Sequence, residues 1–332
     1  MLNQQSILIT GGSGFFGQNF VRYVLKKYPD IGRVIIFSRD ELKHFAMSQD
    51  EVFNDPRIEF AIGDIRDLER LKKVSRNVDF IVHAAALKQV SVAEKSPYEF
   101  IKTNIIGSHN VIEASIENNV SKVVSISTEK ASSPAGLYGA TKLCSDKLFT
   151  SQHNHSYDNQ TTFSVVRYGN VMGSTGSVIP FFLRKREEGK LPITDEKMTR
   201  FNITSNECSE LVLTALEKSI GGEIFVPKLP SFNITDLSDA ISPNALKRII
   251  GIRPGEKLHE EMISTCDASR TIDVGPYFVI TPNDSVSYQD HHKGVNVKPG
   301  FSYSSESNDD WMTVELIREL IRKHIDPDFE PL

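Results

Sequence analysis

Cysteine is scarce in this sequence, and its placement excludes the structures that depend on it. Only three cysteines occur among 332 residues, at Cys144, Cys208 and Cys266, and no two of them have the Cys-x-x-Cys spacing. This distribution excludes a disulfide framework and argues against a cysteine-ligated metal site, so no metal is expected. Unpaired cysteines suit a reducing compartment, and we therefore expect a cytoplasmic protein.

The sequence also lacks long apolar runs and an excess of basic residues. No stretch of about 18 apolar residues occurs, which excludes a membrane-spanning helix. The polar first six residues lead directly into an apolar segment, so no signal peptide is expected. The formal net charge is −5, so neither nucleic acid nor an anionic membrane surface is an expected partner.

What the sequence does contain, at its start, is a strand followed by a glycine-rich turn and a helix. Residues 6–10 form an apolar strand, and three glycines spaced three residues apart precede an amphipathic helix. The first glycine allows a tight turn, the second lets a pyrophosphate approach the backbone, and the third permits close helix–strand packing. The turn therefore predicts a dinucleotide site, whose contacts here would be Gly11, Ser13, Gly14, Phe15, Phe16 and Gly17.

The end of the second strand indicates which dinucleotide is bound. A site specific for NAD usually has an acidic residue there to bond the ribose 2′-hydroxyl. Here the strand over residues 33–37 ends in Ser38 and Arg39, and Lys43 follows closely. Cations suit a 2′-phosphate, so NADP is favoured, with NAD the alternative because an acidic residue in this segment can also reach the ribose. The predicted contacts of this segment are Ser38, Arg39, Asp40, Glu41, Leu42 and Lys43.

Two further strands end in residues that suit the rest of a dinucleotide. The strand over residues 59–62 is followed by Asp64 and Ile65, a polar and an apolar contact for the adenine. The strand over residues 79–83 is followed by small residues that leave room for a flat cofactor, and then by a lysine near the phosphates. These contacts are Ala84, Ala85, Ala86 and Lys88. We expect His83 and Asn104 to be packing residues rather than catalysts.

Strands and helices alternate from residue 6 to about residue 130, which predicts an α/β fold with a Rossmann-type doubly wound parallel sheet. We place the NADP-binding domain at residues 1–170, with later strands around 201–230 returning to it. Residues 171–332 would form mainly a smaller, interleaved substrate-binding lobe and a C-terminal tail. Within the tail we expect residues 281–310 to be irregular and Asn308 or Asp310 to cap a last helix over residues 311–324.

A tyrosine and a lysine four residues apart follow the fifth strand. Residues 120–126 form this strand, and a loop containing Pro134 separates it from a helix that begins near Tyr138. Tyr138 and Lys142 lie on one face of that helix. A lysine ammonium beside a phenol favours the phenolate, so Tyr138 is predicted to accept a hydroxyl proton near neutral pH. Hydride transfer from an alcohol requires such a base.

The residues at the end of the same strand add a second chemistry. Thr128, Glu129 and Lys130 precede the loop, and an acid and an amine together exceed what hydride transfer needs. An acid can protonate a leaving hydroxyl, and an amine of lowered pKa can remove a proton next to a carbonyl. Oxidation, proton abstraction, loss of water and hydride return together make a 4,6-dehydration of a hexose. The guanidinium groups of Arg200 and Arg253 are candidates for the phosphates of its carrier.

Long stretches of the sequence resemble the inverting UDP-N-acetylglucosamine 4,6-dehydratases of bacterial pseudaminic acid synthesis. The similarity spans nearly the whole chain and is carried by residues 9–12, 38–43, 83–88, 137–147, 167–171 and 253–260. The resemblance implies a catalytically bound NADP, a UDP-sugar substrate, a role in surface glycan synthesis and assembly into a homo-oligomer, a dimer or a hexamer.

The resemblance also implies roles for individual residues. It implies that Lys130 removes the C5 proton, that Tyr138 is the base for oxidation at C4 and that Lys142 lowers the pKa of the tyrosine. Contacts to the UDP-sugar are expected from Lys88, Lys130, Tyr138, Asn170, Thr199, Arg200, Arg253 and Glu256. The chain departs from the family at Glu129, where an aspartate is usual, and at Asn202, where an aromatic residue is usual.

Three alternatives follow from these motifs. A configuration-retaining 4,6-dehydratase is the nearest, although such relatives tend to lack the tyrosine and to carry membrane segments. A nucleotide-sugar 4-epimerase shares Tyr138 and Lys142 but has no use for Glu129 and Lys130. A dinucleotide-sensing regulatory protein on the same fold usually loses the Tyr/Lys pair, which is present here.

Overall fold

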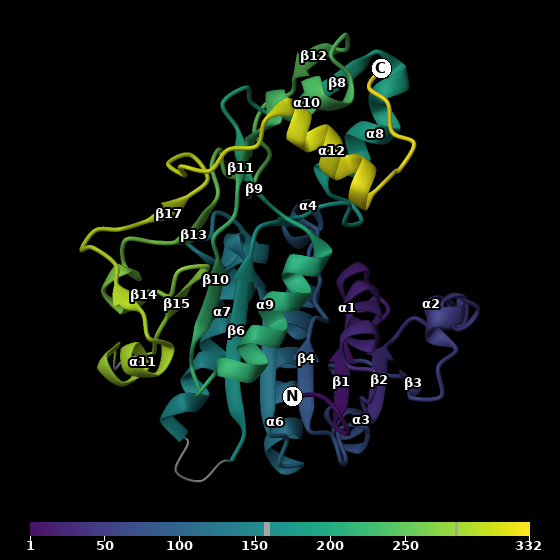
Figure 1. The fold of residues 1–332 in the computed structure, drawn as a ribbon, viewed down its shortest axis with the longest axis vertical. Helices are drawn as coiled ribbons and strands as arrows, with labels where there is room; N and C mark the ends of the chain where they lie inside the picture. The colour runs from purple at the N-terminus through teal and green to yellow at the C-terminus, as the bar shows by residue number, and fades with distance from the viewer. Residues whose placement is uncertain (156–159, 283–284) are drawn as a thin grey trace.

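Runs of β-branched and apolar residues form the strands of one large sheet. In the computed structural model, which describes residues 1–155, 160–282 and 285–332, ten strands of the described chain share this sheet (Figure 1). Their order is β16 (Val295–Asn296), β14 (Thr271–Asp273), β15 (Tyr277–Ile280), β10 (Ile224–Pro227), β6 (Thr162–Tyr168), β5 (Lys122–Thr128), β4 (Phe80–His83), β1 (Ser6–Thr10), β2 (Arg33–Ser38) and β3 (Ile58–Ile62).

The strands from β10 to β3 run parallel, and β15, β14 and β16 continue the sheet antiparallel. The parallel part has the doubly wound order 3-2-1-4-5-6 with β10 added beside β6, and its chain reversal lies between β1 and β4. Strands β1, β4 and β6 are almost continuously buried, as expected for strands covered on both faces. The predicted fold class is therefore confirmed.

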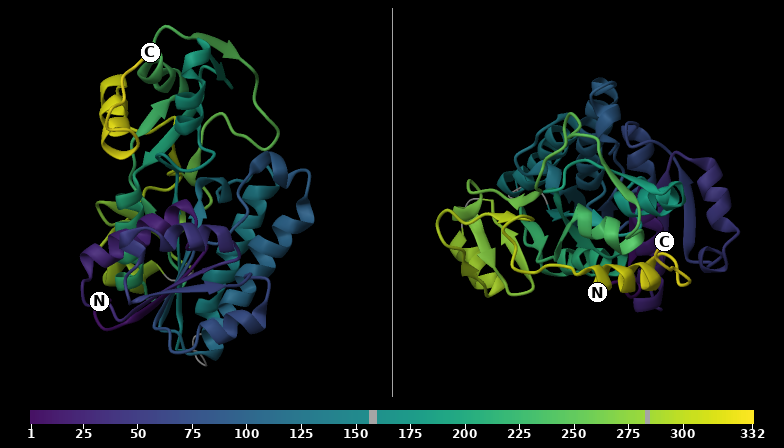
Figure 2. Two further views of the ribbon diagram at one scale, coloured as in Figure 1. Left: turned by 90° about the vertical axis from the view of Figure 1, so that its right-hand side faces the viewer. Right: turned by 90° about the horizontal axis from the view of Figure 1, so that it is seen from above.

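Helices cover both faces of the sheet. Helices α1 (Phe15–Lys27) and α9 (Ser205–Lys218) pack together on one face, whereas α3 (Leu68–Val74), α6 (Gly107–Glu117) and α7 (Leu137–Ser151) lie on the other (Figures 1 and 2). Helix α2 (Glu41–Ser48) lies beyond β2 at the edge. Between β4 and α6 the chain forms α4 (Val90–Ala93), α5 (Pro97–Phe100) and a π-helical segment, η2 (Ile101–Ile106).

A second, smaller core lies beyond the carboxyl ends of the parallel strands. Its buried side chains include Phe182, Ile193, Leu237, Ile317 and Phe329. Figure 2 shows this lobe above the sheet, with the C-terminus at its far end. It is built from α8 (Val178–Lys185), β8 (Lys190–Ile193), α10 (Ile234–Ile241), β12 (Leu246–Ile249) and α12 (Val314–His324), and the strands β7 (Asn170–Val171), β9 (Thr199–Ile203) and β11 (Ser231–Asn233) connect it to the sheet.

The chain returns to the main sheet more often than the sequence-based division at residue 170 provides for. Besides α9 and β10, the strands β14, β15 and β16 pair into it, because the apolar residues of β15 bury against β10. A two-stranded ribbon, β13 (Glu261–Ile263) with β17 (Tyr303–Ser304), packs beside them. Residues 281–310 were predicted to be irregular, but they contain the helix α11 (Ser285–His292). Residues 283 and 284 of this tail lie outside the described residues.

The last helix begins later than the sequence predicted. Thr313 caps α12 by accepting a hydrogen bond from the Leu316 amide, so neither Asn308 nor Asp310 is the cap. Asn308 instead donates to the Leu229 carbonyl, and the Asp310 carbonyl accepts from the Ser231 amide, so the segment before α12 is tied to β11.

Within the described residues the three cysteines are free, and no helix there combines the length and the apolar character that crossing a bilayer requires.

The glycine turn permits a direct test of the packing between β1 and α1. A Cβ added at Gly17 would lie 2.5 Å from the Cα of Gly12, whereas one added at Gly14 would approach only the Gly11 carbonyl oxygen, at 3.1 Å. We expect Gly17→Ala to lower the free energy of unfolding by roughly 1–3 kcal/mol, because overpacking forces the helix away from the turn. Denaturant titration without nucleotide measures this loss. Gly14→Ala is the matched control, and an equal loss in both variants would contradict the packing role of Gly17.

Candidate active site

A cavity of about 1300 Å³ lies at the carboxyl ends of the parallel strands, between the sheet and the smaller lobe. This is the position at which doubly wound sheets bind ligands. The predicted site residues that line it are Gly11, Ser13, Gly14, Phe15, Phe16, Gly17, Ser38, Arg39, Asp40, Lys43, Asp64, Ile65, Ala84, Ala85, Ala86, Lys88, Thr128, Glu129, Lys130, Tyr138, Lys142, Asn170, Arg200, Arg253 and Glu256. Glu41, Leu42 and Thr199 do not line it.

The glycine turn fits a dinucleotide. Gly11 has a φ of +69°, and a Cβ there would lie 2.8 Å from the backbone of Ala85, so only glycine fits between β1 and the chain after β4. Helix α1 begins immediately after Gly14 and carries no acidic residue in its first turn. Its free amide groups therefore face the cavity without a competing negative charge, which suits a pyrophosphate.

The segment after β2 carries both cations and carboxylates. The Ser38 hydroxyl hydrogen-bonds with the Ser13 hydroxyl at 2.8 Å, which fixes the end of β2 beside the glycine turn. The Asp40 carboxylate caps α2 by accepting from the Lys43 amide at 3.1 Å, and it also pairs with the Lys43 ammonium at 3.1 Å. These contacts hold the pKa of Asp40 below its usual value and commit its carboxylate to the helix start. Glu41 and Leu42 lie in the first turn of α2, outside the cavity.

Asp64, predicted to contact the adenine, already forms ion pairs within the protein. Its carboxylate pairs with Arg66 at 2.6 Å and lies 3.7 Å from the Arg39 guanidinium. Arg39 itself is more than half exposed at its side chain, 57%, and is therefore free to reorient toward an anion in the cavity. Ile65 is 4% exposed and lines the cavity, and its contact with the adenine stays a prediction.

Hydrogen bonds from Asn104 hold the loop that follows β4 in place. Asn104, on η2, accepts from the Leu87 amide at 2.8 Å and donates to the Leu87 carbonyl at 2.9 Å. It also donates to the Thr141 hydroxyl on α7, so one buried amide aligns the loop with the tyrosine helix. Burial lowers the pKa of Lys88 in this loop, and burial lowers the pKa of His83 to about 3, so the histidine is a neutral packing residue.

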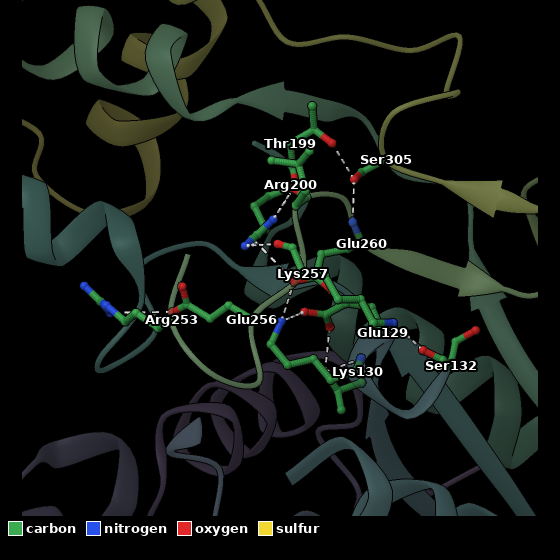
Figure 3. A network of polar contacts seen from close by, with 12 residues as sticks. Glu129, Lys130, Ser132, Thr199, Arg200, Arg253, Glu256, Lys257, Glu260 and Ser305 are labelled. Carbon is green, nitrogen blue, oxygen red and sulfur yellow. Dashed lines mark hydrogen bonds and ion pairs between the residues drawn. The ribbon is translucent and has the colours of Figure 1, made fainter. Parts of the chain in front are cut away.

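The end of β5 places an acid and an amine in the cavity. Glu129 and Lys130 form a single 3₁₀ turn, η3 (Glu129–Ala131), that Thr128 caps. The Thr128 hydroxyl donates to Glu129 Oε2 at 2.6 Å, and the Lys130 ammonium donates to Glu129 Oε1 at 2.8 Å. Figure 3 shows that the same ammonium also meets Glu260, whose Oε1 accepts at 2.6 Å.

The Tyr138 environment differs from the prediction. The Lys142 amine donates to the Ile126 carbonyl at 2.8 Å, so it braces α7 against β5. Burial, followed by the negative charge of Glu129, raises the pKa of Tyr138, although Lys130 and a hydrogen bond with Thr128 act in the opposite direction. The expectation that Lys142 keeps Tyr138 ionised is therefore wrong for the protein without ligands. The pKa of Lys142 is itself lowered by burial.

Lys130 also differs from the prediction of an amine of lowered pKa. Burial acts to lower its pKa, but the charges of Glu129 and Glu260 outweigh burial, and the pKa is raised. Arg200 opposes this increase. In the protein without ligands Lys130 is therefore an ammonium held between two carboxylates.

The sugar-side residues fall into two groups. Asn170, Arg253 and Glu256 line the cavity, and both Asn170 Oδ1 and Glu256 Oε2 are buried without a hydrogen-bond partner among the described residues. Such orphaned acceptors suit the donors of a bound ligand. Arg253 lies 3.6 Å from Glu256, and its side chain is 55% exposed, so its guanidinium remains available to an anion.

Thr199 and Arg200 belong to the second group, whose polar atoms are engaged within the protein. The Thr199 hydroxyl hydrogen-bonds with His259 and Ser305, at 2.8 and 2.7 Å. The Arg200 guanidinium donates to the carbonyls of Thr199, Leu258 and Lys257. The Arg200 guanidinium thus braces this segment through three backbone oxygens. Because Arg200 also lines the cavity, its contact with a phosphate stays a prediction.

Two residues near the centre of the site were missed by the sequence reasoning. Glu260 reaches Lys130 from the chain just before β13, and Lys257 donates to the Ser132 carbonyl from the same segment. The only sequence signal for them is the residue run 253–260, which contains them but does not indicate that they approach β5. Both lie more than 120 residues from the partners that they contact.

Comparison with known proteins identifies the family. The sequence matches the model of the polysaccharide biosynthesis protein family over residues 7–282. An inverting UDP-N-acetylglucosamine 4,6-dehydratase of Campylobacter jejuni is 49% identical over 331 residues, which cover 97% of this chain and 98% of the relative. The chain belongs to the family of inverting UDP-N-acetylglucosamine 4,6-dehydratases. The resemblance seen in the motifs is thereby confirmed.

Other proteins and solved structures are also similar to this chain. A UDP-glucose 4-epimerase of Rickettsia akari is 40% identical over 288 residues, 84% of either chain. The solved structure of Pen from Bacillus thuringiensis matches with a TM-score of 0.89 at 35% identity, over 97% of this chain and 98% of its own. The dTDP-glucose 4,6-dehydratase DesIV of Streptomyces venezuelae, solved with NAD and TYD bound, matches with a TM-score of 0.67 at 26% identity, over 76% and 87%.

The resemblance leads us to expect an aspartate at the position of Glu129, and the structure accommodates the longer glutamate. The Glu129 carboxylate bends between the Thr128 hydroxyl and the Lys130 ammonium, and the side chain is 4% exposed. The second departure, Asn202, is buried on β9 opposite Asn170 of β7 and does not line the cavity.

The absence of a side chain at Gly139 allows α7 to pack closely against the backbone of Lys130. A Cβ at this position would overlap the carbonyl oxygen of Lys130 and lie 2.9 Å from Pro134 Cβ. We expect Gly139→Ala to move Tyr138 relative to Lys130 and to lower kcat with UDP-N-acetylglucosamine by on the order of 100-fold. Steady-state kinetics measure this loss. Cys144→Ala, on the exposed face of the same helix, should retain wild-type kcat. A Gly139→Ala enzyme of wild-type kcat would show that this approach is not needed.

Proposed function

We propose that the protein converts UDP-N-acetylglucosamine to a UDP-4-keto-6-deoxy-N-acetylhexosamine with inversion at C5. The steps are oxidation at C4, removal of the C5 proton, loss of the C6 hydroxyl as water, and hydride return to C6 together with delivery of a proton to the opposite face of C5, which inverts that centre. The observation that carries the proposal is the pairing of Glu129 with Lys130, close to Tyr138, in the cavity that also contains the glycine turn. An enzyme that only oxidises or epimerises has no use for this acid–amine pair.

The residues of β5 and α7 divide the proton transfers between them. Tyr138 accepts the proton of the C4 hydroxyl, after which the C4 ketone acidifies the C5 hydrogen. Lys130 removes that hydrogen, and Glu129 protonates the departing C6 hydroxyl. Thr128 supports both groups, because its hydroxyl contacts Glu129 and accepts from the Lys130 amide. Lys142 keeps α7 in place through the Ile126 carbonyl.

The cofactor of this proposal is NADP, which when bound accepts a hydride from C4 and later returns it to C6. The glycine turn and the start of α1 would hold its pyrophosphate. Arg39 and Lys43 would hold the 2′-phosphate, and Ser38 stands where an NAD site usually has a carboxylate. Asp40 is committed to capping α2, which supports NADP over NAD.

The UDP-sugar would occupy the part of the cavity shared by the sheet and the smaller lobe. Arg253 has the exposure and charge to hold a diphosphate. Asn170 Oδ1 and Glu256 Oε2, which have no partner in the described part of the chain, offer acceptors to sugar or uracil donors. Lys88, at the mouth of the sheet, supplies a further cation. The retaining dehydratase is the weaker alternative, because such relatives tend to lack a tyrosine at the position of Tyr138.

The wider setting of the proposal rests on the family. We propose a role in bacterial surface glycan synthesis, in the pseudaminic acid pathway, and a homo-oligomer, either a dimer or a hexamer. Three free cysteines support a reducing, cytoplasmic location.

The reaction is tested by incubating the purified protein with UDP-N-acetylglucosamine in heavy water and following the sugar by proton NMR. We expect a 4-keto-6-deoxy sugar with inverted C5 to form without added reductant. Lys130→Ala should abolish this product, because no amine then removes the C5 proton. Retention at C5 would favour the retaining alternative. Formation of the 4-epimer by wild type and Lys130→Ala alike would instead support a 4-epimerase.

The cofactor is tested by titrating the protein with NADPH and NADH and following nucleotide fluorescence. NADPH should bind more tightly than NADH. Arg39→Ala should weaken NADPH binding by roughly tenfold or more, because a charge-assisted hydrogen bond is lost, and should leave NADH binding within about twofold. Equal losses for both nucleotides would assign Arg39 to a part of the cofactor that the two share.

A further inference from the structure

Glu260 reaches the reacting end of the site from a distant part of the chain. Its Oε1 accepts a hydrogen bond from the Lys130 ammonium at 2.6 Å, which is shorter than the 2.8 Å contact between Lys130 and its own neighbour Glu129. The side chain of Glu260 is 1% exposed, and that of Lys130 is 21% exposed toward the cavity. Glu260 does not itself line that cavity, so it meets the sugar site through Lys130.

The position of Glu260 is fixed by contacts on both its backbone and its carboxylate. The Glu260 amide donates to the Ser305 hydroxyl at 2.9 Å, and the Ser305 amide donates to the Glu260 carbonyl at 2.8 Å. Arg200 Nε lies 3.4 Å from Glu260 Oε1, and the rest of the Arg200 guanidinium holds backbone carbonyls. Figure 3 shows Arg200, Glu260 and Lys130 in one connected network that includes Ser305. A carboxylate held this firmly restricts the amine that it contacts.

Several charged or titratable groups face Lys130. Glu129 lies on its own turn, Glu260 precedes β13, Arg200 comes from β9, Tyr138 from α7 and Lys257 from the loop before Glu260. The two carboxylates are the groups in direct contact with the ammonium.

A chamber of about 10 Å³ adjoins this network, and its lining includes Lys130, Tyr138, Lys257 and Glu260. That volume is about the size needed for a single water molecule. The second carboxylate oxygen of Glu260 is buried and has no hydrogen-bond partner among the described residues. Glu260 thus has an acceptor to spare in the space next to the two groups that exchange protons with the sugar.

We propose that Glu260 is a positioning residue, whose carboxylate aims the Lys130 amine at the sugar and stabilises the ammonium that forms when Lys130 takes the C5 proton. This role rests on the proposed dehydration. In that step the C5–H bond breaks, its electrons pass into the enolate of the 4-ketone, and the proton moves to Nζ of Lys130. The new positive charge forms 2.6 Å from a fixed carboxylate, so Glu260 strengthens the base without contacting the substrate.

The proposal predicts a pH signature that a merely structural residue would not give. Glu260→Gln keeps the shape and one acceptor oxygen but removes the charge, so the pKa of Lys130 should fall by about 1–3 units. The acidic limb of the pH profile of kcat should move down by the same amount. At a pH above the acidic limbs of both enzymes, where Lys130 is neutral in each, the variant should have a lower kcat than wild type, because the weaker base removes the C5 proton less readily. The ratio of variant to wild-type kcat should therefore rise as the pH falls.

A second readout does not depend on catalysis. Acetic anhydride acylates only neutral amines, so the labelling rate of Lys130 against pH, measured by peptide mass spectrometry, reports its pKa directly. Glu260→Gln should label at Lys130 about tenfold faster than wild type at a pH below both pKa values. Glu261→Gln is the matched control, because Glu261 is the next residue along the chain and contacts Ser132 and Ser133 rather than the amine. It should match wild type in labelling and in the pH limb.

An unchanged limb and an unchanged labelling profile in folded Glu260→Gln would overturn the proposal. If that variant does not fold, Glu260→Asp takes its place, because it keeps the charge and withdraws it by one methylene. In Glu260→Asp, the acidic limb of the kcat profile and the labelling profile of Lys130 should shift in the direction expected for Glu260→Gln, but by a smaller amount. The absence of any shift would overturn the proposal. If wild type forms no keto sugar, the proposed function fails, and the labelling comparison still decides whether Glu260 controls Lys130.

Discussion

An ammonium held between two buried carboxylates joins the two halves of this protein at its reacting centre. Lys130 and Glu129 come from the end of β5, whereas Glu260 comes from the chain before β13. A charge taken out of water is costly unless it is paired and hydrogen-bonded, so the C-terminal segment must dock correctly for the β5 turn to be stable. The active site and the closure of the fold over it are therefore one structural requirement.

A second buried ion pair supports the strands that carry this turn. Arg167 on β6 lies 3.2 Å from Asp146 on α7 and also donates to the Met262 carbonyl on β13. Asp146 accepts from the Ser127 hydroxyl on β5 as well, so one carboxylate connects two strands to the tyrosine helix. Hydrophobic packing alone is less directional than these contacts. The polar network thus fixes the spacing between the β5 turn and α7, on which proton transfer depends.

In the protein without ligands, Tyr138 and Lys130 are both protonated. Burial raises the pKa of Tyr138, and the flanking carboxylates raise that of Lys130. The site is therefore arranged to bind positive charge at Lys130, where the proposed reaction generates it. Glu129 fits this arrangement because its carboxylate folds back between Thr128 and Lys130.

The parallel sheet, the glycine turn and the helix that carries Tyr138 and Lys142 could be predicted from the amino-acid order, because these features depend on local patterns of apolar residues, glycines and spacing. The same order also placed most of the cavity lining, since the ends of parallel strands meet at one edge. The tertiary structure alone decided that Arg200 braces backbone carbonyls, that Lys142 holds Ile126, and that Glu260 grips Lys130. Those outcomes depend on contacts across 16 to 130 residues and on the burial of charge, neither of which any local pattern specifies.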